Sequence, residues 1–188
     1  MCLFEGAEEL DWAGPYEVLA AWAQLWPDDG VEVFTVADAT EVRCAKGLRV
    51  LPDHTWATAP PDVLVFPGGV GTRREREDET TLGRLRDLAA AGTLMTSVCT
   101  GSLVYASAGL LDGRPATTWW GAIEALGDLG DGIDVQPEAR FVDNGDVVTA
   151  AGVSAGIDMA LHLVARLHSV ERAREVRRYI QYDPEPPV

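Results

Sequence analysis

The sequence predicts an α/β fold of three layers, in which a mostly parallel sheet carries helices on both faces. Short runs rich in Val, Leu and Phe, typical of buried strands, alternate with helical patterns along the 188 residues. The connections are short, and right-handed crossovers place helices on both faces of such a sheet. No low-complexity linker and no internal repeat interrupts the pattern, so we expect one domain over residues 1–188.

The strands and helices follow from runs of apolar residues and from their flanking signals. The clearest strand candidates are Val31–Val36, Asp62–Phe66 and Thr93–Val98. Helices are expected where Pro or an N-cap residue precedes a helical pattern, or where Gly follows it. They are Pro15–Leu25, Thr80–Ala91, the run AGIDMALHLVARL capped by Ser154, and Val170–Tyr179.

Other segments are expected to be short strands or extended chain. EVRCAKGLRVLP predicts two short strands about a glycine turn, and RFVDNGDVVTA carries Asn144-Gly145, the commonest signal for a two-residue hairpin turn. Both are expected to be antiparallel additions. CLFEG is a short first strand, and YDPEPPV is an extended tail.

The composition excludes several classes of function. Asp and Glu number 30 against 15 basic residues, a net charge of −15, which disfavours binding to nucleic acid. The three cysteines stand in unrelated contexts, and no His, Cys and Asp cluster has metal-ligand spacing, so we expect neither disulfides nor a metal. No signal peptide or membrane-spanning run is present, which favours a cytoplasmic protein without membrane partners.

The acidic residues are scattered along the chain, which is typical of the solvated surface of a protein from a salt-loving organism. Salt screens the repulsion between these charges. We therefore expect the melting temperature to rise as salt is increased up to molar concentrations, as measured by thermal unfolding. A melting temperature that does not respond to salt would remove this interpretation.

Cys99 is the first candidate catalytic residue. It closes the strand TLMTSV and is followed by Thr100-Gly101-Ser102 and a helical pattern, the layout of a nucleophile elbow. The N-terminus of the following helix favours a thiolate, which nucleophilic chemistry needs. The alternative is that Cys99 is a small buried apolar residue, as most free cysteines are.

The turn Pro67-Gly68-Gly69-Val70-Gly71 directly follows a predicted strand. An N–H group of Gly69 or Val70, together with the amide of Thr100, could form an oxyanion hole. A plain turn is the alternative. The turn lacks the spacing of a phosphate-binding loop.

Two carboxylates are candidates for a partner of Cys99. Asp11, in the segment LDWAGP, would share one proton with the thiol and act as an acid near neutral pH if it faced the sulfur. Glu17, on the following helix, competes for this role. Asp11 could instead be a surface or turn residue.

The histidines and tryptophans are less specific. His54, His162 and His168 are expected to be structural or exposed, so no catalytic Cys-His pair is visible. Trp12, Trp119 and Trp120 are candidate pocket walls, although tryptophans can equally belong to the core.

Several segments of the sequence carry a family resemblance: VCTGS with AGLLDGRPATT, the PGGVG turn, LDWAGPYEVL and AAGVSAGIDMALHLVARL. Together they resemble the ThiJ/PfpI superfamily, which is related to class I glutamine amidotransferases. Within it the chain is most similar to the isonitrile hydratase branch, on Leu10–Pro15, Ser97–Ser102, Ala116–Trp120 and Tyr182–Pro187. The resemblance implies a flavodoxin-like sandwich, usually a homodimer. It also implies Cys99 as nucleophile, Asp11 as its carboxylate partner, Thr100 and the glycine turn at the substrate, and no cofactor.

In the mechanism so implied, Cys99 attacks an isonitrile carbon to give a thioimidate, Asp11 supplies the proton, and water releases a formamide. The sequence departs from the family pattern at two positions. Trp119 replaces the histidine of the isonitrile hydratase pattern. Thr100 stands where PfpI-type peptidases have histidine, which argues against protease activity.

The alternative functions are a glyoxalase or deglycase, a redox-sensing module in which Cys99 is oxidised, and a ligand-binding domain without chemistry. AraC-type regulators carry a similar domain followed by a helix-turn-helix module, so a DNA-binding role would need such a module.

Overall fold

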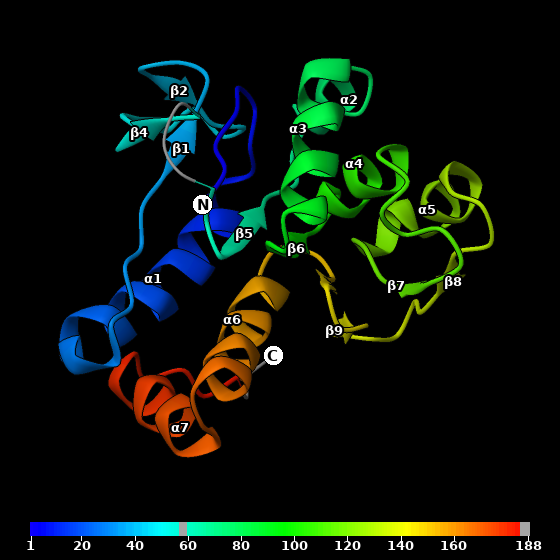
Figure 1. Ribbon diagram of the computed structural model, residues 1–188. Helices are drawn as coiled ribbons and strands as arrows, with labels where there is room; N and C mark the ends of the chain where they lie inside the picture. Colours follow the sequence, from blue (N-terminus) through cyan, green and yellow to red (C-terminus); the bar gives the residue numbers. More distant parts are fainter. Residues whose placement is uncertain (57–59, 185–188) are drawn as a thin grey trace.

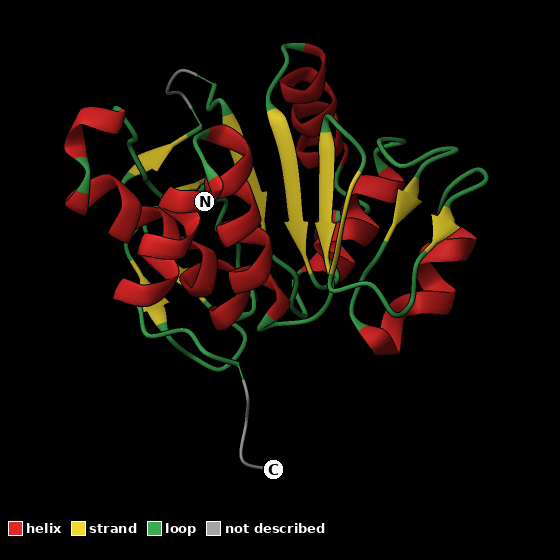
Figure 2. Ribbon diagram, turned by 90° about the horizontal axis from the view of Figure 1, so that it is seen from below, coloured by secondary structure: helices red, strands yellow, loops and turns green. Residues whose placement is uncertain are grey.

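A central sheet with helices on both faces organises the computed structural model, which describes residues 1–56 and 60–184 (Figures 1 and 2). The middle strands are β5 (Val63–Phe66), β6 (Leu94–Val98), β10 (Val147–Ala150) and β9 (Phe141–Asp143), in that order. β5, β6 and β10 are parallel, and β9 is antiparallel to β10. The predicted α/β architecture with a mostly parallel sheet is therefore confirmed.

The sheet continues beyond β5 through the start of the chain. Cys2 forms an isolated bridge with Val36, and its N–H donates to the Val65 carbonyl at 2.9 Å. β1 (Val36–Ala37) pairs in turn with β4 (His54–Thr55), in parallel. The CLFEG segment thus lies in the sheet as expected, but only as a single bridge.

One face of the sheet is covered by α1 (Glu9–Leu25) and α6 (Ala155–Leu167), with α7 (Val170–Tyr179) packed on these two helices. The other face is covered by α3 (Glu79–Ala90) and α4 (Gly101–Ser107) (Figure 1). Successive side chains of β5 point to opposite faces, as the pleat of a strand requires. Val65 packs in the cluster beneath α1 and α6, while Leu64 and Phe66 pack in the cluster beneath α3 and α4. The core therefore has two halves, separated by the strands.

The smaller elements lie at the two ends of the sheet. β2 (Val42–Arg43) and β3 (Arg49–Val50) form the predicted antiparallel pair. β7 (Pro115–Ala116) pairs in parallel with β8 (Asp134–Val135). The remaining helical elements are η1 (Pro27–Asp29), α2 (Thr72–Glu75), η2 (Trp120–Ala122) and α5 (Ile123–Leu129).

Two predicted boundaries were wrong. Val31–Val36 is a strand only at Val36: among the described residues, the Phe34 and Thr35 carbonyls each accept one hydrogen bond, but no strand pairs with residues 31–35. The helix predicted at Pro15–Leu25 begins at Glu9, and Pro15 lies inside it. The acidic side chain of Glu9 in its first turn favours this longer helix through the helix dipole.

The hairpin between β9 and β10 is present, but its turn is shifted by one residue. The Asn144 N–H donates to the Val147 carbonyl at 3.1 Å, so the turning residues are Gly145 and Asp146 rather than Asn144 and Gly145. Gly145 has φ of 105°, which suits the first position of a type II′ turn.

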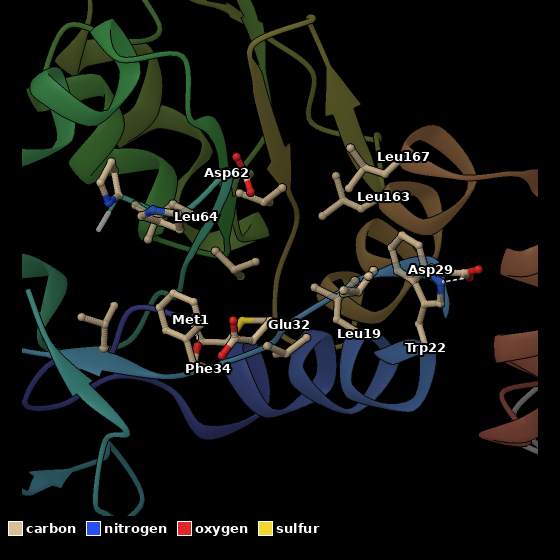
Figure 3. A pocket seen from close by; sticks show the side chains of 18 of the residues that line it. Met1, Leu19, Trp22, Asp29, Glu32, Phe34, Asp62, Leu64, Leu163 and Leu167 are labelled. Atoms are coloured by element: carbon tan, nitrogen blue, oxygen red, sulfur yellow. Dashed lines mark hydrogen bonds between the residues drawn. The ribbon is translucent and has the colours of Figure 1, made fainter. Parts of the chain in front are cut away.

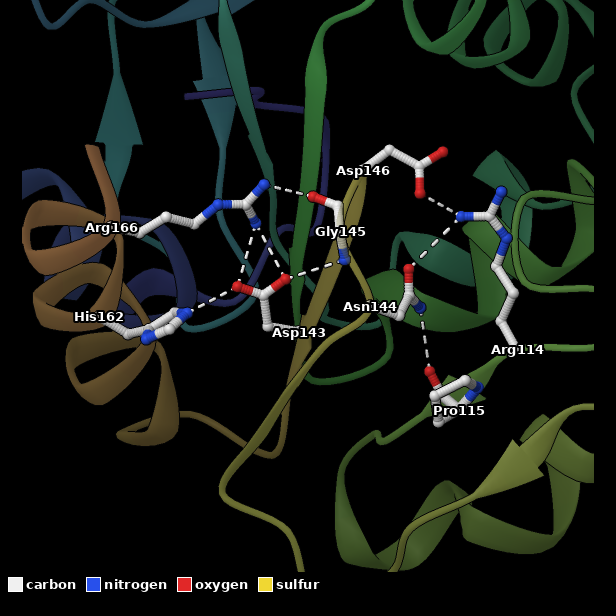
Figure 4. Close-up of polar contacts among 8 residues, drawn as sticks. All are labelled: Arg114, Pro115, Asp143, Asn144, Gly145, Asp146, His162 and Arg166. Atoms are coloured by element: carbon white, nitrogen blue, oxygen red, sulfur yellow. Dashed lines mark hydrogen bonds and ion pairs between the residues drawn. The ribbon is translucent and has the colours of Figure 1, made fainter.

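The hairpin is fixed to its neighbours by polar contacts (Figure 4). The Asp143 carboxylate contacts His162 at 2.7 Å and Arg166 at 2.9 Å, both on α6. Burial opposes the charge of this carboxylate, but hydrogen bonds from His162 and the Gly145 N–H, with the charge of Arg166, hold the pKa of Asp143 below its ordinary value.

The caps of the last two helices differ. The Ser169 side chain accepts a hydrogen bond from the Arg172 N–H at the start of α7, whereas Ser154 stands at the N-cap of α6 without a side-chain cap bond.

The described helices include none that is long and apolar enough to cross a membrane. Of the Tyr182–Pro187 motif, the last three residues lie outside the described part of the chain.

Candidate active site

Cys99 lies at a sharp bend between β6 and α4, as the sequence predicts. Its φ is +58°, in the left-handed region that side chains other than glycine rarely adopt. The hydroxyls of Thr118 and Ser102 donate to the Cys99 carbonyl at 2.9 and 3.1 Å and hold the bend in place. Strain of this kind, about 1–2 kcal/mol, persists where surrounding contacts fix it and is common at active sites.

Glycines on both sides of the bend allow the backbones to approach closely. A Cβ on Gly101 would lie 2.5 Å from the Phe66 carbonyl oxygen. A Cβ on Gly68 would lie 2.6 Å from the Thr100 nitrogen and 2.8 Å from Asp11 Oδ2. The PGGVG turn therefore sits directly against the elbow and the N-terminal part of α1.

Asp11 is the carboxylate that lies beside Cys99. It is fully buried, and its Oδ2 accepts a hydrogen bond from the Gly68 N–H at 2.8 Å. The Cys99 thiol favours the charged form of this carboxyl group, whose Oδ1 is buried without a hydrogen-bond partner among the described residues. Glu17, the competing candidate, is exposed on α1, because it lies six residues further along the helix and faces solvent.

Burial and mutual repulsion change the acidity of both groups. Burial raises the pKa of Asp11 to about 7, against the opposing effect of the Gly68 hydrogen bond. Burial, followed by the charge of Asp11, raises the pKa of Cys99 to about 12. Cys99 is 7% exposed, so the expected thiolate-favouring effect of the helix N-terminus is outweighed by burial. From about neutral pH upward, the pair therefore holds one proton between two acidic atoms.

The backbone N–H groups of Thr100 and Val153 and the Thr100 hydroxyl favour the charged form of the sulfur and partly offset the effect of burial on the pKa of Cys99. Val153 has φ of +47°, an outlier for a β-branched residue, in the turn that precedes α6. Val153, Ser102 and Thr118 were not predicted as site residues. No local signal could have identified Val153, because its contribution is a backbone group that every residue except proline carries.

The glycine turn makes different contacts from those expected. The Gly69 N–H donates to the Thr100 hydroxyl oxygen at 3.1 Å, and the Thr72 hydroxyl donates to the Gly69 carbonyl at 2.8 Å. The Thr100 amide favours the charged form of the sulfur, and Val70 is 59% exposed within the turn. In this state, the Gly69 amide is therefore engaged by Thr100 rather than directed at a ligand.

The three tryptophans lie in different environments. Trp12 is buried in the core cluster that also contains Phe4, Val42 and Cys44, which favours a structural role over a pocket wall. Trp119 is partly buried and packs so closely on the turn before α6 that a Cβ on Gly152 would lie 2.5 Å from its ring. Trp120 is 78% exposed and stacks obliquely on Trp119, with ring centroids 5.0 Å apart.

A large cavity lies elsewhere in the molecule (Figure 3). It has a volume of about 650 Å³ and is bounded by α1, the segment 30–34, the start of β5 and the end of α6. Its walls are mostly apolar and include Leu19, Trp22 and Leu163, with Asp29 at one end. None of the predicted site residues lines it, because it opens at the amino end of β5 whereas Cys99 follows the carboxyl end of β6.

Residues 1–56 and 60–184 contain no group of three or more His, Cys, Asp or Glu side chains placed to hold a metal ion. The three histidines contact groups other than the cysteine. His162 binds Asp143, His168 lies 3.4 Å from Asp29, and the His54 ring packs on Phe34.

Comparison with known proteins extends the resemblance seen in the sequence. The chain is 41% identical to the isonitrile hydratase of Pseudomonas putida over 187 residues, which cover 98% of this chain and 78% of the hydratase. It is 32% identical over 149 residues to the HTH-type transcriptional regulator GbdR of Pseudomonas aeruginosa, which covers 78% of this chain but 40% of the regulator. It is 28% identical to the Parkinson disease protein 7 homolog of Danio rerio over 180 residues, or 93% of this chain and 92% of that protein.

Solved structures show the same fold. A THiJ/PfpI family protein from Pseudomonas syringae superposes with a TM-score of 0.89 at 34% identity, covering 100% of this chain and 76% of that one. Drosophila melanogaster DJ-1beta superposes with a TM-score of 0.84 at 23% identity, covering 97% and 96% of the two chains. The fold is thus the expected flavodoxin-like α/β sandwich. Residues 1–166 match the DJ-1/PfpI family, and the chain belongs to that family.

Proposed function

We propose that the protein is a hydratase that adds water to a small isonitrile through a covalent intermediate on Cys99. The observation that carries the proposal is the buried pair of Cys99 and Asp11, a nucleophile and an acid that hold one proton between them. The similarity to an isonitrile hydratase over nearly the whole chain supports the same substrate class. The partner is a small molecule, and the chemistry as written requires no cofactor.

The first step forms a bond between the Cys99 sulfur and the terminal carbon of the isonitrile. Asp11 takes the thiol proton of Cys99 as the sulfur attacks and passes it to that carbon, which leaves a thioimidate on the enzyme and a charged carboxylate. The product of this step, R–N=CH–S–Cys99, is neutral at the former isonitrile group. A carboxyl group whose pKa is about 7 can both give and take this proton near neutral pH.

The second step consumes water. Asp11 takes a proton from water while the oxygen bonds to the thioimidate carbon, and that proton is passed to the nitrogen. The tetrahedral adduct then collapses. Its hydroxyl proton, the second proton of the water molecule, passes to Asp11, the carbon–sulfur bond breaks, and the N-substituted formamide leaves. The sulfur departs as a thiolate, to which the N–H groups of Thr100 and Val153 donate.

The remaining predicted residues take supporting roles in this proposal. Thr100, Gly69 and Val70 would contact the substrate end nearest the sulfur, once substrate competes for the Gly69 amide. Trp119 and exposed Trp120 would offer apolar surface to the substituent on the isonitrile nitrogen. Trp12 is not included, since it is buried in the core. A homodimer stays a prediction, which sedimentation velocity would test.

Two rival functions are less well supported. A glyoxalase or deglycase reaction must shuttle protons between neighbouring carbons, and the three histidines contact Asp143, Asp29 and Phe34 instead of the site. Redox sensing favours an accessible thiolate, whereas Cys99 is 7% exposed and its burial raises its pKa to about 12. D-lactate formation from methylglyoxal, or selective peroxide oxidation of Cys99 without turnover, would promote one of these rivals.

The proposal is tested by incubating the purified protein with a simple alkyl isonitrile and following formamide by NMR. Turnover is expected, with kcat/KM rising as pH increases through about 7, because Asp11 loses its proton there and the pair reaches its one-proton state. No formamide from alkyl or aryl isonitriles at any pH between about 6 and 9 would contradict the proposal.

A further inference from the structure

A slot one strand wide lies between β5 and residues 31–35, the facing segment that precedes β1. Cys2 occupies the inner end of the slot. It forms a parallel bridge with Val36 and donates its N–H to the Val65 carbonyl at 2.9 Å. Neighbouring strands lie about 4.8 Å apart, so the two edges that Cys2 joins leave room for one extended chain between them.

The large cavity continues this line past Met1. Figure 3 shows Asp62 and Leu64 of β5 and its start on one side of the cavity, and Glu32 and Phe34 of the facing segment on the other. The cavity is therefore the space in which the strand position of Cys2 continues between β5 and the facing segment.

The two walls of the slot direct backbone hydrogen-bonding groups into it. The Asp62 carbonyl accepts the Leu94 N–H at 2.8 Å, so Asp62 and every second residue after it face β6. The alternate residues, Val63 and Val65, face the slot. In the described part of the chain, their N–H groups and the Phe34 N–H form no hydrogen bond. Backbone groups inside a protein are nearly always paired, so two facing edges of this kind indicate a site for another strand.

Space for side chains is present on both faces of the slot. On one face, the large cavity is lined by α6 and by Leu19 and Trp22 of α1. A second cavity of about 220 Å³ shares Phe34 and Pro61 with the first and reaches Leu88 of α3, which covers the opposite face of the sheet. Because the side chains of a strand alternate between the two faces, an extended apolar segment would fill the two cavities in turn.

We propose that the slot is an interaction site for an extended apolar peptide of about four residues, the length of β5. The peptide continues the ladder that Cys2 begins, so it runs parallel to β5 with its carboxyl end at Met1. Its backbone pairs with Val63 and Val65 on one edge and with Phe34 on the other. An apolar small molecule of the same volume would leave these groups unpaired, which favours a peptide as the occupant.

The test is amide hydrogen exchange, measured by NMR on the 15N-labelled protein. The probe is an acetylated peptide of two lysines followed by four alternating valines and isoleucines. Exchange at the amides of Val63, Val65 and Phe34 should slow at least about tenfold, because each gains a hydrogen bond inside the sheet. The control peptide carries proline in place of both valines. It lacks two of the N–H groups that the slot requires and should leave exchange at these amides unchanged.

A second experiment removes the dependence on peptide affinity. The same four residues are joined directly to the N-terminus of the full chain, ahead of Met1, and the proline version again serves as control. Protection by the free peptide supports the proposal. Protection only in the joined form would assign the slot to a strand covalently attached to Met1 and overturn a partner peptide. No protection in either experiment would show that the slot does not accept a strand.

The hydrogen-exchange measurement is independent of the proposed hydratase activity. The slot opens at the amino end of β5, whereas Cys99 follows the carboxyl end of β6. Exchange is measured without turnover, so its outcome does not depend on whether isonitriles are the substrates.

Discussion

Replacing Cys99 with alanine or serine is expected to abolish isonitrile hydration, with kcat/KM at least about 10³-fold lower, because loss of a covalent nucleophile removes the intermediate itself. Serine retains an acceptor for the N–H groups of Thr100 and Val153, so Cys99→Ser tests chemistry with the least disturbance of the bend. The measurement is formamide formation under saturating and limiting isonitrile, together with mass spectrometry of the denatured enzyme for an adduct in the wild type.

Cys44 provides the matched control. It is also a buried free cysteine, but it lies near Trp12 and the β2–β3 turn instead of the elbow. Cys44→Ala should retain turnover within about threefold, the range expected when a side chain outside the reacting site is changed. Hydration that survives Cys99→Ala would reject the nucleophile assignment.

The fold was largely predictable because its signals are local. β6 ends at Val98 and α4 begins at Gly101, close to where the apolar run and the small residues after Cys99 place them. Predictions failed where pairing between distant segments decides the outcome. Val31–Val36 is rich in Val and Phe, as β5 is, yet only Val36 and Ala37 have a neighbouring strand in the described chain.

The candidate site was predictable only in part, for a related reason. The pattern around Cys99 indicates an elbow, but it left Asp11 and Glu17 open as partners, and only the packing of α1 against the PGGVG turn separates them. The sequence also favoured a thiolate from the helix N-terminus. Burial acts against it, and burial at 7% exposure is a property of the assembled fold.

Asp11→Asn is expected to stabilise the folded protein at pH 8 while removing most of its activity. The folded-state pKa of Asp11, about 7, lies above its ordinary value of 3.8, so ionising Asp11 favours unfolding. This destabilisation is absent below pH 4, grows as pH rises to about 7, and is constant above it, with a ceiling of about 4 kcal/mol. The asparagine side-chain oxygen can still accept the Gly68 N–H, so the local packing is preserved.

The free energy of unfolding should be measured by urea denaturation at pH 4 and pH 8, beside turnover at pH 8. The variant should gain stability over the wild type only at the higher pH, and its kcat should fall at least about 10²-fold because it cannot carry the proton. Glu17→Gln is the matched control: it removes the same charge from the same helix at an exposed position, and it should change neither quantity. A stability gain equal at both pH values would show that Asp11 is charged at little cost, and the one-proton pair with Cys99 would then be wrong.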